Sequence, residues 1–407
     1  MLIYVMHQAG GIVGSSKSAE DVFRALLEMG RPLTIVSRSQ DTQSWQLTKH
    51  LAVPVNWLPL ERNVPFPTTL NWRTPRCVAS WAKHGLLDVF RRRRRSILGR
   101  AQLAVVNSLG SQPLWESVAD AFSGRTALIV RESPRHFNSP SSPYSLEWAV
   151  AALSTHSVLI FVSARCRDEW LEMDQLRGKP AFYVPNCCDE EQALPLLQQD
   201  PTAVRQELGL PSDRFVAVCV ASIQPRKGQD ILLDLFPDLL DAIPNLSLFL
   251  VGPLRGQWAD QTLRRIDRQQ FTGRVVATGP RPDALKYIHA ADCLVLPSRA
   301  EAMPRVILEA MALKTPVVAA DVDGIPELIE HGINGRLFSH DRPQGLVEGL
   351  ARVAGDPQRA AAMAERAYDK YWACFSRAQL IHRFKCVFDD ILRPAAVRRT
   401  DQETAAP

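Results

Sequence analysis

Two glutamates, Glu301 and Glu309, are separated by seven residues of a predicted loop and helix. Glu309 would lie about 7–8 Å along the helix axis from its start. A helix N-terminus can hold a pyrophosphate. A ribose attached to it would lie near Glu309, and a sugar at the other end near Glu301. The alternative is a solvated acidic helix beside an ordinary loop glutamate, because Glu is common on helices.

The elements that position these glutamates are predicted from residues 293–320. CLVLP is a short apolar run that reads as a buried strand. PRVILEAMAL has the apolar spacing of one helix face, with Pro304 suited to the first helical position. PVVAA is then a second strand. Strand, loop, helix and strand form a βαβ unit, and Glu301 follows the carboxyl end of its first strand, where open parallel sheets bind ligands.

Two adjacent cations, Arg226 and Lys227, follow another predicted strand, FVAVCVAS. They therefore belong to the same edge of a parallel sheet as Glu301. Two cations there would neutralise a pyrophosphate and stabilise it as a leaving group. The alternative is a solvated turn.

Composition sets the outer limits on fold and function. A chain of 407 residues is too long for one ordinary core, so two domains are expected. The net charge of +5 suits anionic substrates or a membrane surface and is too weak to indicate nucleic-acid binding. Eight cysteines without a CxxC motif predict free thiols in a reducing cytoplasm. We expect neither a signal peptide nor a membrane span.

Alternating strand and helix patterns predict two doubly wound parallel sheets, an α/β fold. We expect a first domain over residues 1–190 and a second over residues 191–375. A C-terminal helix over 376–393 would precede a disordered tail, 394–407.

The first domain offers weaker candidates. Gly10 and Gly11 form a glycine-rich turn after the first strand, which could face a ligand or only permit close packing. Arg131 and Glu132 follow a later strand, where Arg131 could contact a phosphate or form a surface pair with the glutamate. The arginine run 91–95 is either a solvated helix face or a patch for anionic lipid.

Residues 298–318 resemble the signature of glycosyltransferase family 4 in Ser298, Glu301, Pro304, in Glu309 to Ala312 and in Pro316 to Val318. The resemblance extends from Phe215 to Phe338, and is weaker before it. Ala302 and Ser222 stand where the family usually has Gly and Arg. The resemblance implies two Rossmann-like domains facing across a cleft, the GT-B fold. It implies a retaining transferase that takes a sugar from a nucleotide-sugar without a metal or other cofactor.

The resemblance also implies roles for individual residues. Glu301, Lys227 and Arg226 would be catalytic, with Arg131 and Glu132 possible contacts of the acceptor or a phosphate. The expected donor-binding residues are Glu309, Gly10, Gly11, Ser222, Gly279, Arg281, Ala302, Met303, Pro304, Arg305 and Val306. The expected acceptor is a saccharide or lipid-linked saccharide of cell-surface polysaccharide synthesis, reached from the cytoplasm, with peripheral membrane contact as a further hypothesis.

Other functions remain open from the sequence. The fold also suits a nucleotide-sugar epimerase, a phosphorylase, or a catalytically silent protein that binds a nucleotide-sugar. Asp321 and Asp323 mimic a metal-binding DxD motif, but two carboxylates alone make a poor metal site. The family places a turn into a helix there.

Overall fold

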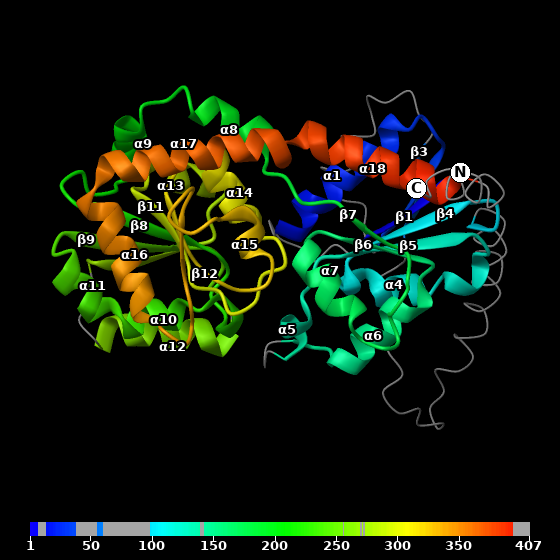
Figure 1. The fold of residues 1–407 in the computed structure, drawn as a ribbon, viewed down its shortest axis with the longest axis horizontal. Helices are drawn as coiled ribbons and strands as arrows, with labels where there is room; N and C mark the ends of the chain where they lie inside the picture. The colour runs from blue at the N-terminus through cyan, green and yellow to red at the C-terminus, as the bar shows by residue number, and fades with distance from the viewer. Residues whose placement is uncertain are drawn as a thin grey trace, which may run out of the picture.

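The computed structural model describes residues 1–6, 14–37, 55–59, 98–138, 142–254, 256–268, 271 and 273–393. These residues form two lobes, each built on its own parallel sheet (Figure 1). The predicted α/β class with two doubly wound domains is confirmed.

The first sheet has the strand order β3-β2-β1-β4-β5-β6-β7, parallel throughout. Its strands are β1 Leu2–Met6, β2 Leu33–Ser37, β3 Val55–Pro59, β4 Leu103–Asn107, β5 Arg125–Val130, β6 Val158–Phe161 and β7 Ala181–Tyr183. Successive side chains point to opposite faces of a strand. Leu2 and Tyr4 of β1 accordingly join one hydrophobic cluster, while Ile3 and Val5 join another. Both faces of this sheet are therefore buried.

The second sheet has the order β10-β9-β8-β11-β12-β13 and is also parallel. Its strands are β8 Phe215–Val220, β9 Leu246–Val251, β10 Val275–Gly279, β11 Cys293–Leu296, β12 Val317–Ala320 and β13 Arg336–Phe338. Strand order reverses between β8 and β11, and this switch point is where open α/β sheets bind ligands.

Helices connect the strands of each sheet. Those of the first lobe are α1 Gly14–Glu28, α4 Gln112–Glu116, α5 Pro134–Phe137, α6 Leu146–Thr155 and α7 Ala164–Leu171, with 3-10 turns η1 Leu109–Ser111 and η2 Ala119–Ala121. Those of the second are α8 Glu190–Leu196, α9 Pro201–Glu207, η3 Pro225–Lys227, α10 Gln229–Asp234, α11 Phe236–Ala242, α12 Gly256–Arg268, α13 Ala284–Ala290, α14 Arg305–Ala312, α15 Ile325–Leu328, α16 Gln344–Gly355 and α17 Pro357–Cys374.

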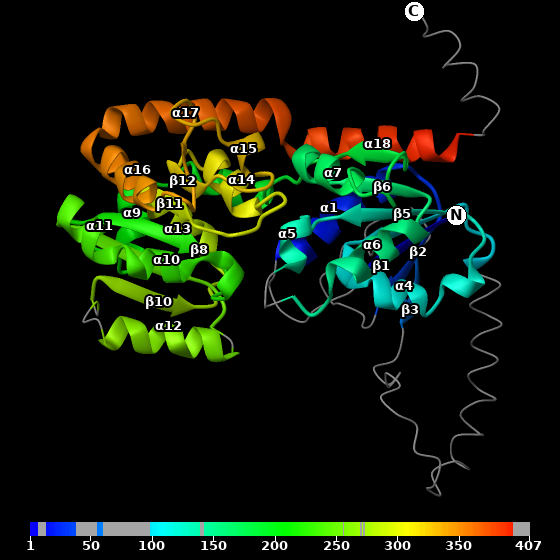
Figure 2. The same ribbon diagram turned by 60° about the horizontal axis from the view of Figure 1, so that its bottom comes forward.

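The chain returns to the first lobe through its last helix, α18 Arg377–Leu392. Figure 2 shows α17 lying over the second lobe and α18 continuing over the first. Leu380, Phe384 and Phe388 of α18 are buried in the cluster that also contains Leu26 of α1. The two lobes are thus joined twice, by the segment before α8 and by the α17–α18 connection.

The structure differs from what the local sequence pattern suggests at three places. The apolar spacing of residues 231–240 suits a single helix, but these residues belong to two helices, α10 and α11, because Pro237 lacks an N–H and suits only a first helical turn. Pro304 is the N-cap of α14, with an extended ψ of 116°, and not its first helical residue. Strands β3 and β13 were not predicted. Strand β13 has only three residues, and one of them is an arginine.

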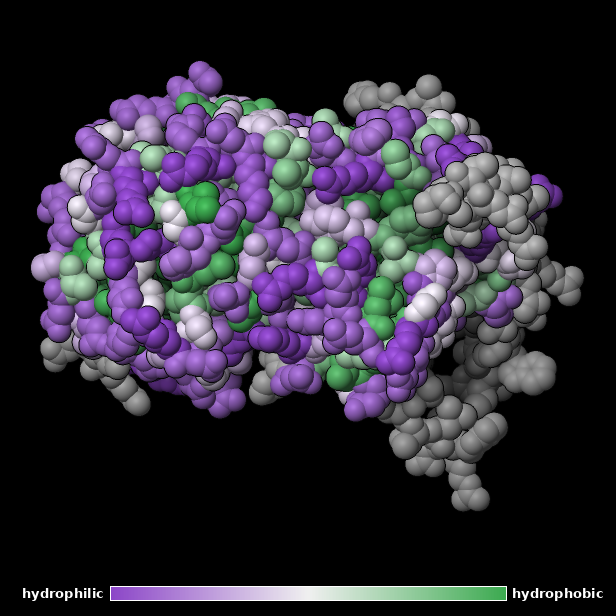
Figure 3. All heavy atoms as spheres, viewed as in Figure 1, coloured by the Kyte–Doolittle hydropathy of each residue, from purple (hydrophilic) through white to green (hydrophobic). Residues whose placement is uncertain are grey.

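The surface seen in Figure 3 is largely hydrophilic, and hydrophilic residues gather where the two lobes meet. Among the helices of the described segments, none is both long enough and apolar enough to cross a membrane.

Candidate active site

The second domain brings two loops together at the carboxyl ends of β8 and β11. The 3-10 turn η3 carries Arg226 and Lys227, and it ends at Gly228, whose φ is 70°. A Cβ on Gly228 would lie 2.1 Å from the carbonyl oxygen of Pro297, so only glycine allows the turn to approach the loop after β11 this closely. That approach places Lys227 beside Glu301.

Glu301 is held in a dense charged network. Its side chain forms an ion pair with Lys227 through Oε1, and the Ser298 hydroxyl donates to the same oxygen at 3.0 Å. Nη1 of Arg226 lies 3.6 Å from Glu301 Oε2 and donates to the carbonyl oxygen of Ala300 at 2.7 Å. The structure therefore brings together the three residues predicted to be catalytic.

Burial and charge act in opposite directions on this network. Burial alone would raise the pKa of Glu301, but Lys227 and Arg226 more than offset it, and the net pKa is lowered. Burial lowers the pKa of Lys227, and Glu301 opposes that change. Glu301 is consequently an ionised carboxylate at neutral pH although it is only 8% exposed.

The first domain presents His136, on α5, to the same cluster. The pKa of His136 is lowered to about 4, mainly by burial. The nearby charges of Arg226 and Lys227 also lower this pKa, and Glu301 opposes them. His136 is therefore neutral at pH 7, able to donate or accept a hydrogen bond without adding a third positive charge. Its segment was noted in the sequence, but His136 itself was not proposed as a site residue.

Asp323 ties the Glu301 loop to the first domain. Its Oδ2 accepts hydrogen bonds from the Glu301 amide at 2.8 Å and from the Ser133 hydroxyl at 2.6 Å. Nε of Arg135 lies 3.4 Å from Oδ1. Asp321 is exposed and lies 3.9 Å from Arg165, so the two carboxylates of the DxD-like sequence serve different partners.

Within the described segments, no group of three or more His, Cys, Asp or Glu side chains is placed to hold a metal ion.

Helix α14 begins at the same edge of the sheet. Ala302 and Met303, in the loop before it, are buried, and the side-chain amide of Asn186 donates to the Met303 carbonyl at 2.9 Å. Glu309 is half-buried on α14. Its charge is close enough to help raise the pKa of Arg305, four residues earlier.

The Arg305 side chain makes contacts between the two domains. Its side chain crosses to the first domain, where Nη1 lies 2.7 Å from Asp21 Oδ2 and donates to the Ser18 hydroxyl at 3.2 Å. Burial would lower the pKa of Arg305, but Asp21 above all raises it. The residue joins the domains, and its next neighbour Val306 is half-buried.

Three further predicted donor residues lie at or just after the ends of β8 and β10. Ser222 accepts a hydrogen bond from the Gln224 side chain at 2.9 Å. Gly279 ends β10 with a φ of 75°. Arg281 pairs with Asp283 at 2.8 Å and stacks over the ring of Tyr287.

Arg131 does not form the expected surface pair with the Glu132 carboxylate. It donates to Asn107 Oδ1 at 3.0 Å, to Asn186 Oδ1 at 2.6 Å and to the Ser18 carbonyl at 3.2 Å. The Glu132 carboxylate accepts a hydrogen bond from the Arg131 backbone amide at 3.0 Å, and burial raises its pKa. Arg131 thus connects β5 to α1 and to the segment entering the second domain.

Gly10, Gly11, the arginine run 91–95 and the tail from 394 lie outside the described residues.

Residues 200–370 match the family model of glycosyl transferases group 1. This region is similar to a glycosyl transferases group 1 domain. The matched region contains Lys227, Glu301 and Glu309. The predicted resemblance to glycosyltransferases is therefore confirmed for the part of the chain that carries the motif. The match is compatible with family 4.

Curated relatives match over the same part of the chain. A D-inositol 3-phosphate glycosyltransferase of Thermobispora bispora is 33% identical over 171 residues, which cover 40% of this chain and 40% of that protein. A GDP-mannose-dependent monoacylated alpha-(1-6)-phosphatidylinositol monomannoside mannosyltransferase of Corynebacterium glutamicum is 31% identical over 197 residues, 45% of this chain and 50% of that protein. The chain matches no more than half the length of either relative.

Solved structures match almost the whole fold. HepE of Anabaena, in complex with UDP-glucose, superposes with a TM-score of 0.75 at 22% identity, covering 96% of this chain and 99% of that one. WaaG, a glycosyltransferase involved in lipopolysaccharide biosynthesis, gives 0.67 at 15% identity over 95% and 99%. The two domains together therefore have the predicted GT-B fold.

Proposed function

We propose that this protein is a retaining glycosyltransferase that moves a sugar from a nucleotide-diphosphate donor to a saccharide or lipid-linked saccharide. The observation that carries the proposal is the cluster of Lys227, Arg226 and Glu301 at the switch point of the second sheet. It provides two cations for a leaving diphosphate and one ionised carboxylate for the sugar hydroxyls.

In the proposed complex, the diphosphate lies between Lys227, Arg226 and the first amides of α14. Glu309 then accepts hydrogen bonds from the ribose hydroxyls, and Glu301 orients the donor sugar. A nucleotide-sugar donor is supported by the name of the GDP-mannose-dependent relative. It also agrees with the binding of UDP-glucose by a protein of the same fold.

Retention requires the new bond to form on the face from which the diphosphate leaves. The acceptor oxygen bonds to the anomeric carbon as the bond from that carbon to the phosphate oxygen breaks. The acceptor's proton passes to the departing phosphate oxygen. Lys227 and Arg226 stabilise the negative charge that develops there, which is the charge change that a preorganised cationic site favours.

The test is a screen of nucleotide-sugars for binding and for slow hydrolysis in the absence of acceptor. Thermal shifts identify the donor, because a ligand that binds only the folded protein raises its melting temperature. Release of a nucleoside diphosphate supports the transferase. Binding without any turnover, with or without candidate acceptors, would instead support the silent binding protein, and conversion of the donor to another nucleotide-sugar would support an epimerase.

Activity should survive an excess of EDTA. The adjacent cations Arg226 and Lys227 can supply the positive charge that a metal supplies in other transferases. The measurement is nucleoside diphosphate release with and without EDTA, before and after Mn²⁺ or Mg²⁺ is added back. Turnover that EDTA abolishes and the metal restores would contradict metal independence.

Replacing Glu309 by Ala should weaken donor binding by about 1–3 kcal/mol, because hydrogen bonds to a charged carboxylate are lost. Calorimetry with the nucleoside diphosphate measures the change. The exposed Glu365 of α17 is a matched control, since Glu365→Ala removes the same group from a helix outside the site. Equal affinities of wild type and Glu309→Ala would reject the ribose assignment.

For the acceptor, we propose a lipid-linked saccharide of cell-surface polysaccharide synthesis, reached at the cytoplasmic face of a membrane. The support is the arginine run 91–95, at about 1 kcal/mol of attraction to anionic lipid per basic residue. Apolar residues flank this run, namely Leu86, Leu87, Val89 and Phe90 before it and Ile97 and Leu98 after it. Wild type should sediment with anionic vesicles and not with neutral ones. A variant with all five arginines changed to Ser should lose this binding, and equal sedimentation of the two proteins would exclude the membrane proposal.

A further inference from the structure

A concave site lies in the second domain between β13 and α16. Its volume is about 270 Å³, and none of the residues assigned to the donor lines it. Water has a share of about 30 Å³ in the liquid, so the pocket has room for a polyatomic ligand. Among its lining residues are His331, Arg336, Arg342, Glu348 and Arg352.

Close packing of α16 on the sheet creates this pocket. A Cβ on Gly349 would lie 3.0 Å from Cγ1 of Val318, and one on Gly345 would lie 3.2 Å from Cβ of Phe338. These two glycines, one helical turn apart, let α16 approach β12 and β13. The next turn of α16 then carries Arg352 to the end of the pocket where Arg336 lies.

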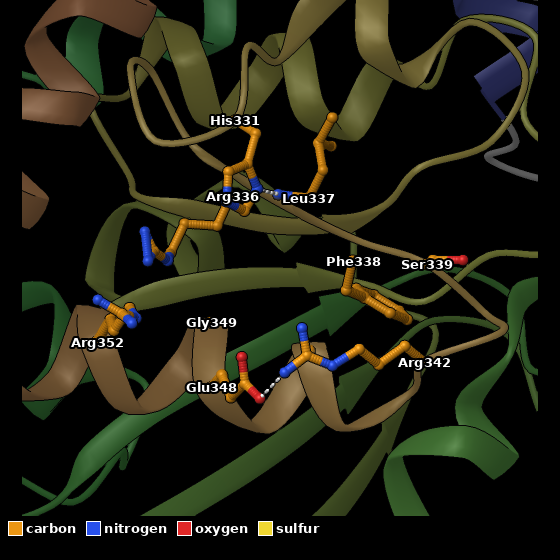
Figure 4. Close-up of a pocket in the computed structure, with 10 residues that line it drawn as sticks. His331, Arg336, Leu337, Phe338, Ser339, Arg342, Glu348, Gly349 and Arg352 are labelled. Carbon is orange, nitrogen blue, oxygen red and sulfur yellow. Dashed lines mark hydrogen bonds and ion pairs between the residues drawn. The ribbon is translucent and has the colours of Figure 1, made fainter.

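The pocket holds more positive charge than its own carboxylate can balance. Glu348 forms its ion pair with Arg342. Figure 4 shows Arg342 reaching toward Glu348, whereas Arg336 and Arg352 extend toward each other at the other end. Burial lowers the pKa of Arg336, the charges of Arg352 and Arg359 lower it further, and Glu348 only opposes them.

Arg336 is the unusual member of this group. It is 9% exposed, and its Nε is buried without a hydrogen-bond partner among the described residues. A guanidinium cannot lose its proton at neutral pH. Buried charges are normally paired and buried donors normally bonded, so this position calls for an anion.

We propose that the pocket between β13 and α16 binds a phosphate group, from inorganic phosphate or from a phosphate monoester, between Arg336 and Arg352. Phosphate oxygens match the paired N–H groups of a guanidinium, and two arginines suit its double charge. His331 can add a donor. Its Nδ1 accepts from the Leu337 amide at 3.0 Å, so the proton of the neutral ring is on Nε2.

The test is calorimetric titration with inorganic phosphate and with glycerol 3-phosphate, at an ionic strength held constant with chloride. Wild type should bind at least one of them. Arg352→Gln should bind at least ten-fold more weakly, and so should Arg336→Gln. Arg352 is exposed, so its variant should fold even if the buried Arg336 does not tolerate replacement.

Two controls locate the binding. Arg264→Gln changes an exposed arginine of α12 and should leave the affinity unchanged. Lys227→Gln removes a cation from the donor site and should also leave it unchanged. A monoester that binds more tightly than inorganic phosphate identifies an organic ligand, and equal affinities identify free phosphate. The proposal is overturned if wild type binds neither, if Arg352→Gln binds like wild type, or if only Lys227→Gln loses binding.

Discussion

Replacing Lys227 by Ala should lower kcat about 100- to 1,000-fold, the usual cost of removing one donor that stabilises developing charge. The leaving diphosphate gains negative charge as its bond to the sugar breaks, and Lys227 is the cation closest to Glu301. Arg226 remains in the variant, so activity should be reduced and not abolished. Steady-state release of the nucleoside diphosphate is the measurement.

The same change has a second consequence, which has to be separated from the first. Without Lys227, the cationic partner that the described residues leave to the buried Glu301 carboxylate is Arg226, at 3.6 Å. Breaking a buried ion pair from one side typically costs about 3–5 kcal/mol of stability. Lys227→Ala combined with Glu301→Gln removes both charges, so it should regain much of the stability but none of the activity. Activity that returns together with stability would mean that Lys227 only supports the fold.

A surface lysine supplies the control for this pair of variants. Lys286 forms an ion pair with Glu207 at 2.6 Å on the outside of the second domain. Exposed pairs contribute about 0–1 kcal/mol, so Lys286→Ala should leave both kcat and stability almost unchanged. A comparable loss of kcat in Lys286→Ala would show that the assay responds to net charge and not to the site.

The charged cluster could be predicted because it follows from a local rule. Residues that come after parallel strands meet at one edge of the sheet, and this rule placed Lys227, Arg226 and Glu301 together from their positions alone. What the rule could not supply is the distance between the two loops. That depends on Gly228 meeting the Pro297 carbonyl, a contact between segments far apart in the sequence.

Contacts between the domains were the part that the sequence could not provide. The family resemblance implied that Arg305 binds the donor and that Arg131 is a possible contact of the acceptor or a phosphate. In the structure, both are used by the protein itself, Arg305 on Asp21 and Arg131 on Asn107 and Asn186. No periodicity or spacing in one domain reveals which residue of the other domain will face it. The partner of each arginine therefore appears only with the structure.

Replacing Asp21 by Asn should destabilise the protein by about 3–5 kcal/mol, because two arginines would lose their shared carboxylate. Asp21 lies on α1 of the first domain, and its side chain is 4% exposed. It lies 2.7 Å from Arg305 of the second domain and 3.6 Å from Arg377 at the start of α18. The midpoint of urea unfolding should fall, and small-angle scattering should show a larger radius of gyration if the domains separate.

The order of effects among related variants is the stricter test. Arg305→Gln should cost less than Asp21→Asn, because Asp21 keeps Arg377 as a partner after the first change. Asp21→Asn instead takes the carboxylate from the buried Arg305 and one of three carboxylates from Arg377, which keeps Asp189 and Glu191. Combining the two changes should cost less than their sum, since neighbouring charges are coupled. The pair Arg177–Asp174, at 3.0 Å and largely exposed, is the control, and Asp174→Asn should stay within about 0.5 kcal/mol of wild type. If Arg305→Gln proves the more damaging variant, Asp21 is not the charge that holds these two arginines, and the contact between the domains depends on α14 instead.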